Sequence, residues 1–258
     1  MSTVSAPPVG HPSPHKAGGR AGSRHFMLRR LHSLTGILFG GYIVVHLLIN
    51  ATLIQGRHPQ DGTWSFETQV AKIHSLPFLL AIEWAFIFIP IIFHTVYGIW
   101  ITLRAEPNPI HYPYFKNVFY TLQRVSAMII VAGLVFHVLG MKGFLGDTLA
   151  FEAGQGKAAA STVRHINAHW TVAFLVYPLF ILASTFHLAN GFWTAGITWG
   201  LTVSKAAQRR WGFVCAGLFA LTFGCGVVAW GASVKLKGLE PAQAQFNNPQ
   251  KAIVDLPK

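Results

Sequence analysis

The amino-acid sequence predicts an all-α membrane protein, a bundle of five transmembrane helices. Of its 258 residues, 52% are hydrophobic and only 11% are charged, whereas about a quarter of an average soluble domain is charged. The apolar residues also gather into five long runs, and about 20 such residues are enough to cross the hydrocarbon core of a bilayer. These runs are Leu31–Ile54, Pro77–Leu103, Val118–Met141, approximately His169–Thr198, and Trp211–Val234.

The spans are expected to be helical because an isolated segment in lipid can satisfy its backbone hydrogen bonds only within an α-helix. The runs also lack the alternation of a β-barrel strand. Pro77 suits the first turn of the second span. Pro90 lies inside that span, four residues before His94, and predicts a kink because proline lacks the backbone donor. Between the first two spans, Phe66–Ile73 is expected to form a short interfacial helix.

The net charge of +12 follows this topology. Basic residues gather before the first span, between the second and third, and between the fourth and fifth, all on one side of the membrane. By the positive-inside rule this side is cytoplasmic, so the N-terminus is expected inside. The same placement explains the charge without nucleic acid as a partner. The residues are Arg24, Arg29, Arg30, Arg104, Lys116, Arg124, Lys205, Arg209 and Arg210.

One transmembrane domain, residues 29–234, is expected between two tails. Residues 1–28 predict a basic disordered tail, because Pro, Gly, Ser and His dominate them and they lack the apolar core of a secretory signal. Residues 235–258 are expected to form a C-terminal tail. Membrane lipid is therefore a partner of most of the chain.

Four of the five runs each contain one histidine, and an ionisable residue at membrane depth suggests a function. At about 1.5 Å per residue, the histidines of the first and third runs lie roughly 22 and 28 Å from the inner ends of those runs. The histidine of the second run lies about 25 Å from its outer end, and that of the fourth run also falls in the inner half. Depth therefore predicts an inner pair, His94 with His187, and an outer pair, His46 with His137.

Two imidazoles at each level favour a haem over a zinc ion. A structural zinc site needs four nitrogen or sulfur ligands, whereas a porphyrin supplies most ligands of its iron and leaves two axial positions. Gly98, Gly133 and Gly191 each lie one turn from one of these histidines, on the same helix face. They would leave room for a flat ring, although close helix packing also uses glycine.

Further polar residues are candidates for contacts with a haem or a quinone. Arg30, His32 and Arg124 lie near the inner ends of their spans, where they would offset haem propionates or simply mark the cytoplasmic side. Glu83 lies near the outer end of the second span and could exchange protons with a quinone or reach interfacial water as a carboxylate. Three further residues are quinone candidates, and each has an alternative role. His74 could be an ordinary loop histidine, Asn190 could contact the haem, and Trp193 could be an interface aromatic. His165 and His169 are expected to be structural and close to water at the start of the fourth span.

Several motifs resemble the cytochrome b558 subunits of succinate dehydrogenase, in unbroken order over residues 24–205. They include Arg29-Arg30-Leu31-His32-Ser33-Leu34, Phe93-His94-Thr95-Val96-Tyr97-Gly98 and Phe186-His187-Leu188-Ala189-Asn190-Gly191. The resemblance implies a five-helix subunit of the type found in succinate:menaquinone oxidoreductases and fumarate reductases. Such a subunit binds two b haems, here through His46, His94, His137 and His187. It also implies a bacterial plasma-membrane location, flavoprotein and iron–sulfur partner subunits, and a quinone, with menaquinone as the expected species.

Other classes of membrane protein remain open at this point. The chain could be the cytochrome b subunit of a hydrogenase or formate dehydrogenase, a haem-free anchor, or a proton-coupled transporter that uses its histidines. The sequence contains no recognisable dicarboxylate site, flavin motif or iron–sulfur cysteine set. The chain is therefore not expected to oxidise succinate by itself, and an electron-transfer role is favoured.

Overall fold

The computed structural model describes residues 19–58, 62–104, 115–153 and 157–237. These residues form helices and turns but no strand, apart from one isolated β-bridge between Arg57 and Trp64. Five helical segments are long and apolar enough to cross a membrane, which confirms the predicted all-α, five-span bundle. They are Arg24–Gln55, Leu79–Leu103, Asn117–Met141, Val172–Thr198 and Lys205–Lys235.

The elements follow one another as helices joined by short connections. In chain order they are α1 (Gly19–Ala51), η2 (Thr52–Gln55), α2 (Ser65–His74), α3 (Leu79–Glu83), η3 (Trp84–Phe88), α4 (Ile89–Leu103), α5 (Phe115–Met141), η4 (Asp147–Leu149), α6 (Ala158–Ile166), η5 (Val172–Val176), α7 (Tyr177–Thr198) and α8 (Lys205–Lys235). The second span comprises α3, η3 and α4, and the fourth comprises η5 and α7. Helix α1 therefore starts within the segment expected to be a tail, while residues 1–18 and 238–258 of the two tails lie outside the described residues.

Each of the two spans that contain an internal proline has a π-helical turn directly before it. The turn η3 precedes Pro90 and the turn η5 precedes Pro178. Proline cannot donate to the preceding turn, so the regular hydrogen-bond ladder is interrupted there. Such π-turns often occur at functional sites, and here each leads into the helix that carries a predicted axial histidine.

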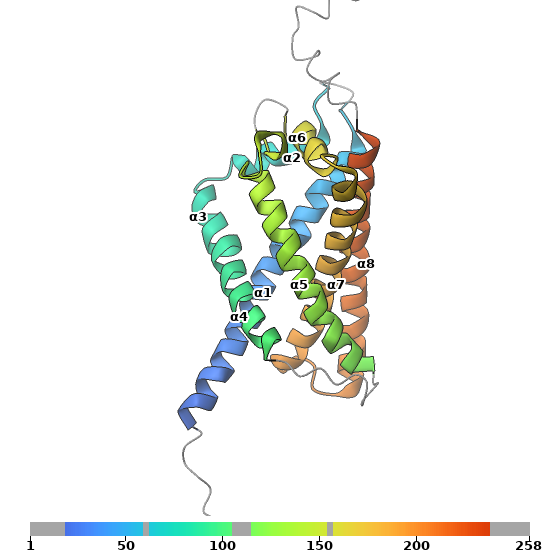
Figure 1. Cartoon of the computed structure of the whole chain (residues 1–258). Helices are drawn as coiled ribbons and strands as arrows, with labels where there is room; N and C mark the ends of the chain where they lie inside the picture. The colour runs from blue at the N-terminus through green and yellow to red at the C-terminus, as the bar shows by residue number, and fades with distance from the viewer. Residues whose placement is uncertain (1–18, 59–61, 105–114, 154–156, 238–258) are drawn as a thin grey trace, which may run out of the picture.

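The two ends of the bundle differ in structure. Figure 1 shows α2 and α6 together at one end, which we call the α6 end, whereas the first turns of α1 project beyond the other. The second end is called the basic end, because α1 begins there with its arginines and α8 begins there with Lys205. Helix α1 packs against α4, α7 and α8, and α7 packs between α5 and α8.

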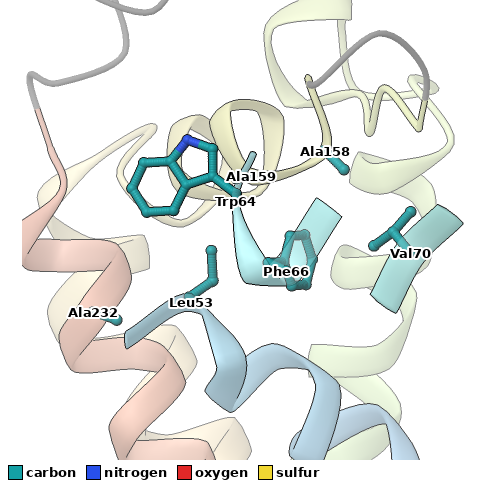
Figure 2. Packing of buried hydrophobic residues seen from close by; sticks show 7 residues of the cluster. All are labelled: Leu53, Trp64, Phe66, Val70, Ala158, Ala159 and Ala232. Carbon is teal, nitrogen blue, oxygen red and sulfur yellow. The ribbon is translucent and has the colours of Figure 1, made fainter. Parts of the chain in front are cut away.

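A compact apolar cluster holds the α6 end together (Figure 2). It joins the end of the first span to α2, α6 and the last turns of α8, through Leu53, Trp64, Phe66, Val70, Ala158, Ala159 and Ala232. Helix α2 confirms the short helix predicted over 66–73. Helix α6 was not predicted, and its His165 is fully buried at 0% exposure. The expectation that water reaches His165 at the start of the fourth span is therefore wrong.

Glu67 links the two short helices of this end. Its Oε1 accepts a hydrogen bond of 2.8 Å from the backbone N–H of Ala159, in the first turn of α6. Replacing Glu67 by Ala is expected to lower the free energy of unfolding by about 1–3 kcal/mol, because a buried N–H loses its acceptor. Glu67→Gln keeps an acceptor and should retain most of the stability. Thermal unfolding of the purified protein in detergent measures both changes, and an unchanged melting curve for the Ala variant would contradict this link.

The same carboxyl predicts a pH dependence. Burial raises the pKa of Glu67 above its ordinary value near 4.5. A raised pKa means that the ionised form is the less stable one in the folded protein, so stability is lost as pH rises from 4.5 through the raised value. The Glu67→Gln variant should lack this loss in the same unfolding experiment.

Candidate functional site

The four intramembrane histidines lie as two pairs at two levels of the bundle. The ring centroids of His94 on α4 and His187 on α7 are 6.2 Å apart with an interplanar angle of 86°. Those of His46 on α1 and His137 on α5 are 6.0 Å apart at 79°. Two imidazoles that bind one metal from opposite sides through bonds of about 2 Å would have ring centres at roughly this separation. The geometry suits axial ligation at both levels, and the ligand roles themselves stay predictions.

Backbone carbonyls orient the pair nearer the basic end. His94 Nδ1 donates to the carbonyl of His32 at 3.0 Å, and His187 Nδ1 donates to the carbonyl of Gln123 at 3.1 Å. A carbonyl only accepts, so Nδ1 carries the hydrogen in each ring and Nε2 carries the lone pair. Metal-binding histidines in proteins are held by such outer contacts, which set the tautomer and the ring orientation.

A second layer of hydrogen bonds fixes the neighbourhood of His187. Gln123 Nε2 donates to the His187 carbonyl at 3.1 Å, and Asn190 Nδ2 donates to Gln123 Oε1 at 2.7 Å. Ser126 Oγ lies 3.4 Å from His187 Nδ1. The link between α5 and α7 thus runs through Gln123, a residue that sequence reasoning missed.

The pair nearer the α6 end is flanked by tyrosines. The Tyr177 hydroxyl lies 3.0 Å from His137 Nδ1. His46 has the Tyr42 hydroxyl 3.4 Å from its Nδ1 and the Asn50 amide 3.4 Å from its Nε2, both at the long limit of a hydrogen bond. Tyr42 and Asn50 each lie one turn from His46 along α1. The other three histidines of the two pairs have a glycine at such a position, and His46 has none.

A cavity of about 530 Å³ surrounds this second pair, and its lining includes His46, His137, Tyr42, Tyr177 and Glu83. The size is typical of a pocket for a cofactor or small molecule. Most of its other lining residues are aliphatic or aromatic. The structure therefore brings Glu83 to the same space as the second histidine pair.

The remaining quinone candidates lie elsewhere. Asn190 is engaged with Gln123 at the level of the first pair, and Trp193 Nε1 donates to the carbonyl of Gln208 at 3.3 Å near the basic end. His74, at the end of α2, places its Nδ1 2.9 Å from the carbonyl of Val70 and does not line the cavity. Glu83 is thus separated from the other three candidates.

Several buried side-chain atoms have no hydrogen-bond partner among the described residues, and three of them are nitrogens of the residues predicted to face haem propionates at the basic end. They are Arg30 Nε, His32 Nδ1 and Arg124 Nε. The Arg30 guanidinium also lies over two aromatic rings, 4.7 Å from the centroid of Phe26 and 4.8 Å from that of Trp199. Buried polar atoms in proteins are almost always satisfied, so these atoms fit a ligand with acidic groups, as a haem has in its propionates.

His165 supplies another such atom, near the second pair. Its Nδ1 donates to the carbonyl of Leu149 at 2.8 Å, and its Nε2 is buried without a partner in the described part of the chain. Its ring lies 6.0 Å from that of His137 at 90°. Burial lowers the pKa of His165, which favours the neutral ring.

The glycines near the histidines face side chains of neighbouring helices. A Cβ atom at Gly98 would lie 3.1 Å from His32 Cε1, one at Gly133 would lie 2.5 Å from Phe180, and one at Gly191 would lie 3.6 Å from Gln123. A Cβ atom at Gly36 would lie 2.6 Å from His94 Cε1. Sequence reasoning missed Gly36, although its position one turn after His32 was a usable signal.

The fold and the two histidine pairs define a multi-pass membrane protein with imidazoles paired inside a helical bundle. No protein-family model matches the chain. It is 32% identical over 190 residues to the succinate dehydrogenase cytochrome b558 subunit of Bacillus subtilis (strain 168), a match that covers 73% of this chain and 87% of the relative. The chain therefore belongs to the succinate dehydrogenase cytochrome b558 subunit family. It is a cytochrome b membrane subunit with a part in electron transport, as its motifs indicated.

Proposed function

We propose that this chain binds two b haems, one at each histidine pair, and passes electrons between an iron–sulfur subunit and membrane quinone. The observation that carries the proposal is the arrangement of four imidazoles in two pairs, with ring centroids 6.2 and 6.0 Å apart. When bound, the two haems would supply one-electron carriers at two depths of the membrane.

Within this proposal the chain provides ligands, orientation and charge. His94 and His187 would present Nε2 to an iron, because their Nδ1 atoms are held by carbonyls. Hydrogen bonds of this kind also make an imidazole a stronger donor to the metal. Arg30 and Arg124 would offset the negative propionates, which accounts for their unpartnered buried atoms.

The basic end is the docking side for the flavoprotein and iron–sulfur subunits. This assignment follows from the cytoplasmic side that the positive-inside rule gives to the arginines of α1 and α8. Quinone, with menaquinone as the expected species, binds at the α6 end near Glu83. The carboxyl there shares a cavity with the second histidine pair, which is the arrangement a proton-coupled acceptor needs.

A spectrum of the purified complex tests the proposal. We expect a b-type band in the reduced-minus-oxidised difference spectrum, two haems b per chain by extraction, and co-purification of a flavoprotein and an iron–sulfur protein. One haem per chain would overturn the two-site assignment. A complex without a b-type band would overturn the haem role altogether.

A further inference from the structure

Helices α1 and α4 cross through a reciprocal pair of histidines and glycines. His32 of α1 packs on Gly98 of α4, where a Cβ atom would lie 3.1 Å from its Cε1. His94 of α4 packs on Gly36 of α1, where a Cβ atom would lie 2.6 Å from its Cε1. In each helix the histidine and the glycine are one turn apart and share a face. We call these four residues the histidine clasp.

The clasp brings the rings of His32 and His94 into direct contact. Their centroids are 4.0 Å apart and their planes differ by 11°, so the two imidazoles are stacked. The His32 carbonyl accepts both the His94 Nδ1 hydrogen at 3.0 Å and the Thr35 hydroxyl at 3.0 Å. Tyr97, which is 8% exposed, lies against His32 with ring centroids 5.6 Å apart. His94 is therefore held by one residue at two points, its flat face and its Nδ1.

From this geometry we infer that His32 is the positioning residue of the inner axial ligand, and that its ring stack sets the orientation of His94 and the reduction potential of the haem it binds. This inference rests on the proposed haem ligation by His94. It gives His32 a role distinct from neutralising a propionate.

Loss of the His32 side chain would shift the reduction potential of the inner haem in opposite directions, depending on whether His32 stacks on His94 or contacts a propionate. Without the stacked ring, His94 can tilt and its hydrogen bond to the His32 carbonyl weakens, which makes the imidazole a poorer electron donor. A poorer donor stabilises the oxidised iron less, so the potential of the inner haem rises. Loss of a hydrogen-bond donor beside a propionate would instead leave more negative charge near the iron, and the potential would fall.

Redox titration of the complex with both haems bound separates these roles. We expect His32→Leu to retain two haems and to raise the potential of the inner haem by about 59 mV, a tenfold change for a one-electron couple. The outer haem should be unchanged, as an internal reference. His32→Phe restores a flat ring without any nitrogen, so it should stay near the wild-type potential. Gly98→Ala should act like His32→Leu, because its Cβ displaces His32.

The matched control is Gly41→Ala on the same helix, since no atom lies within 4 Å of a Cβ at that position. An inner potential that falls in both His32→Leu and His32→Phe would overturn the stacking role in favour of a propionate contact. Unchanged potentials in His32→Leu and Gly98→Ala would also overturn it. If instead the wild-type complex binds no haem, or keeps both when His94 is replaced, the proposed function itself has failed.

Discussion

Replacing His94 by Ala is expected to remove one of the two b haems and to leave the other in place. The pairs lie at separate levels, and His94 shares its level with His187 and not with His46 or His137. Alanine offers no lone pair for the iron, so the site loses an axial ligand. His187→Ala should remove the same haem, whereas His46→Ala and His137→Ala should remove the other. Haem extraction and low-temperature difference spectra of each purified variant measure the loss.

A variant that simply fails to assemble would not separate these sites, so His94→Met is the companion. Methionine supplies a sulfur ligand and raises the potential of a haem that histidine would otherwise bind. The methionine variant should keep two haems and change the potential of one. His169→Ala is the control, because His169 is exposed and bonded to Thr171 within its own turn. Retention of both haems after either His94→Ala or His187→Ala would contradict the ligand assignment.

The features of this fold that depend on bilayer thickness and helix rise could be predicted from the sequence. A bilayer sets the length of a span and the helix rise sets the depth of each residue, so the spans and the levels of the histidines could be derived. The proximity of His94 to His187, and of His46 to His137, agrees with that depth argument. What depth alone cannot supply is the rotation of each helix about its axis, and therefore which atoms meet across an interface.

The features that sequence reasoning missed have different physical causes. Helix α6 has nine residues, and much of its buried face is Ala, Ser and Thr, which gives no apolar run to detect. The bond from His94 Nδ1 to the His32 carbonyl joins two distant segments through a main-chain atom, which no residue pattern can encode. Gly98 was expected to make space for a porphyrin, and here it faces His32, because the rotation of α1 decides what fills that space.

Replacing Glu83 by Gln is expected to lower quinone-linked succinate oxidation by about 10²-fold, a typical loss when a positioned acid–base group is removed. Reduction of a quinone consumes protons, and Glu83 is the one acid among the described residues that line the α6-end cavity. Glutamine keeps the shape and the hydrogen bonding of the side chain but cannot exchange a proton. The haem content and the reduction of an artificial dye by the catalytic subunits should both stay at wild-type levels.

Glu152→Gln is the matched control for that experiment, because it removes an acid at the same end of the bundle that lies outside the cavity. Glu152 is paired with Arg164 at 2.8 Å and with Lys157 at 3.3 Å, near the loop before α6. It should leave quinone reduction unchanged, so a loss confined to Glu83→Gln assigns the effect to the cavity rather than to surface charge. A wild-type quinone rate in Glu83→Gln would place proton uptake at another residue. If dye reduction fell as much as quinone reduction in Glu83→Gln, the substitution would be damaging the complex as a whole. The cavity at the second histidine pair would then have no demonstrated part in quinone chemistry.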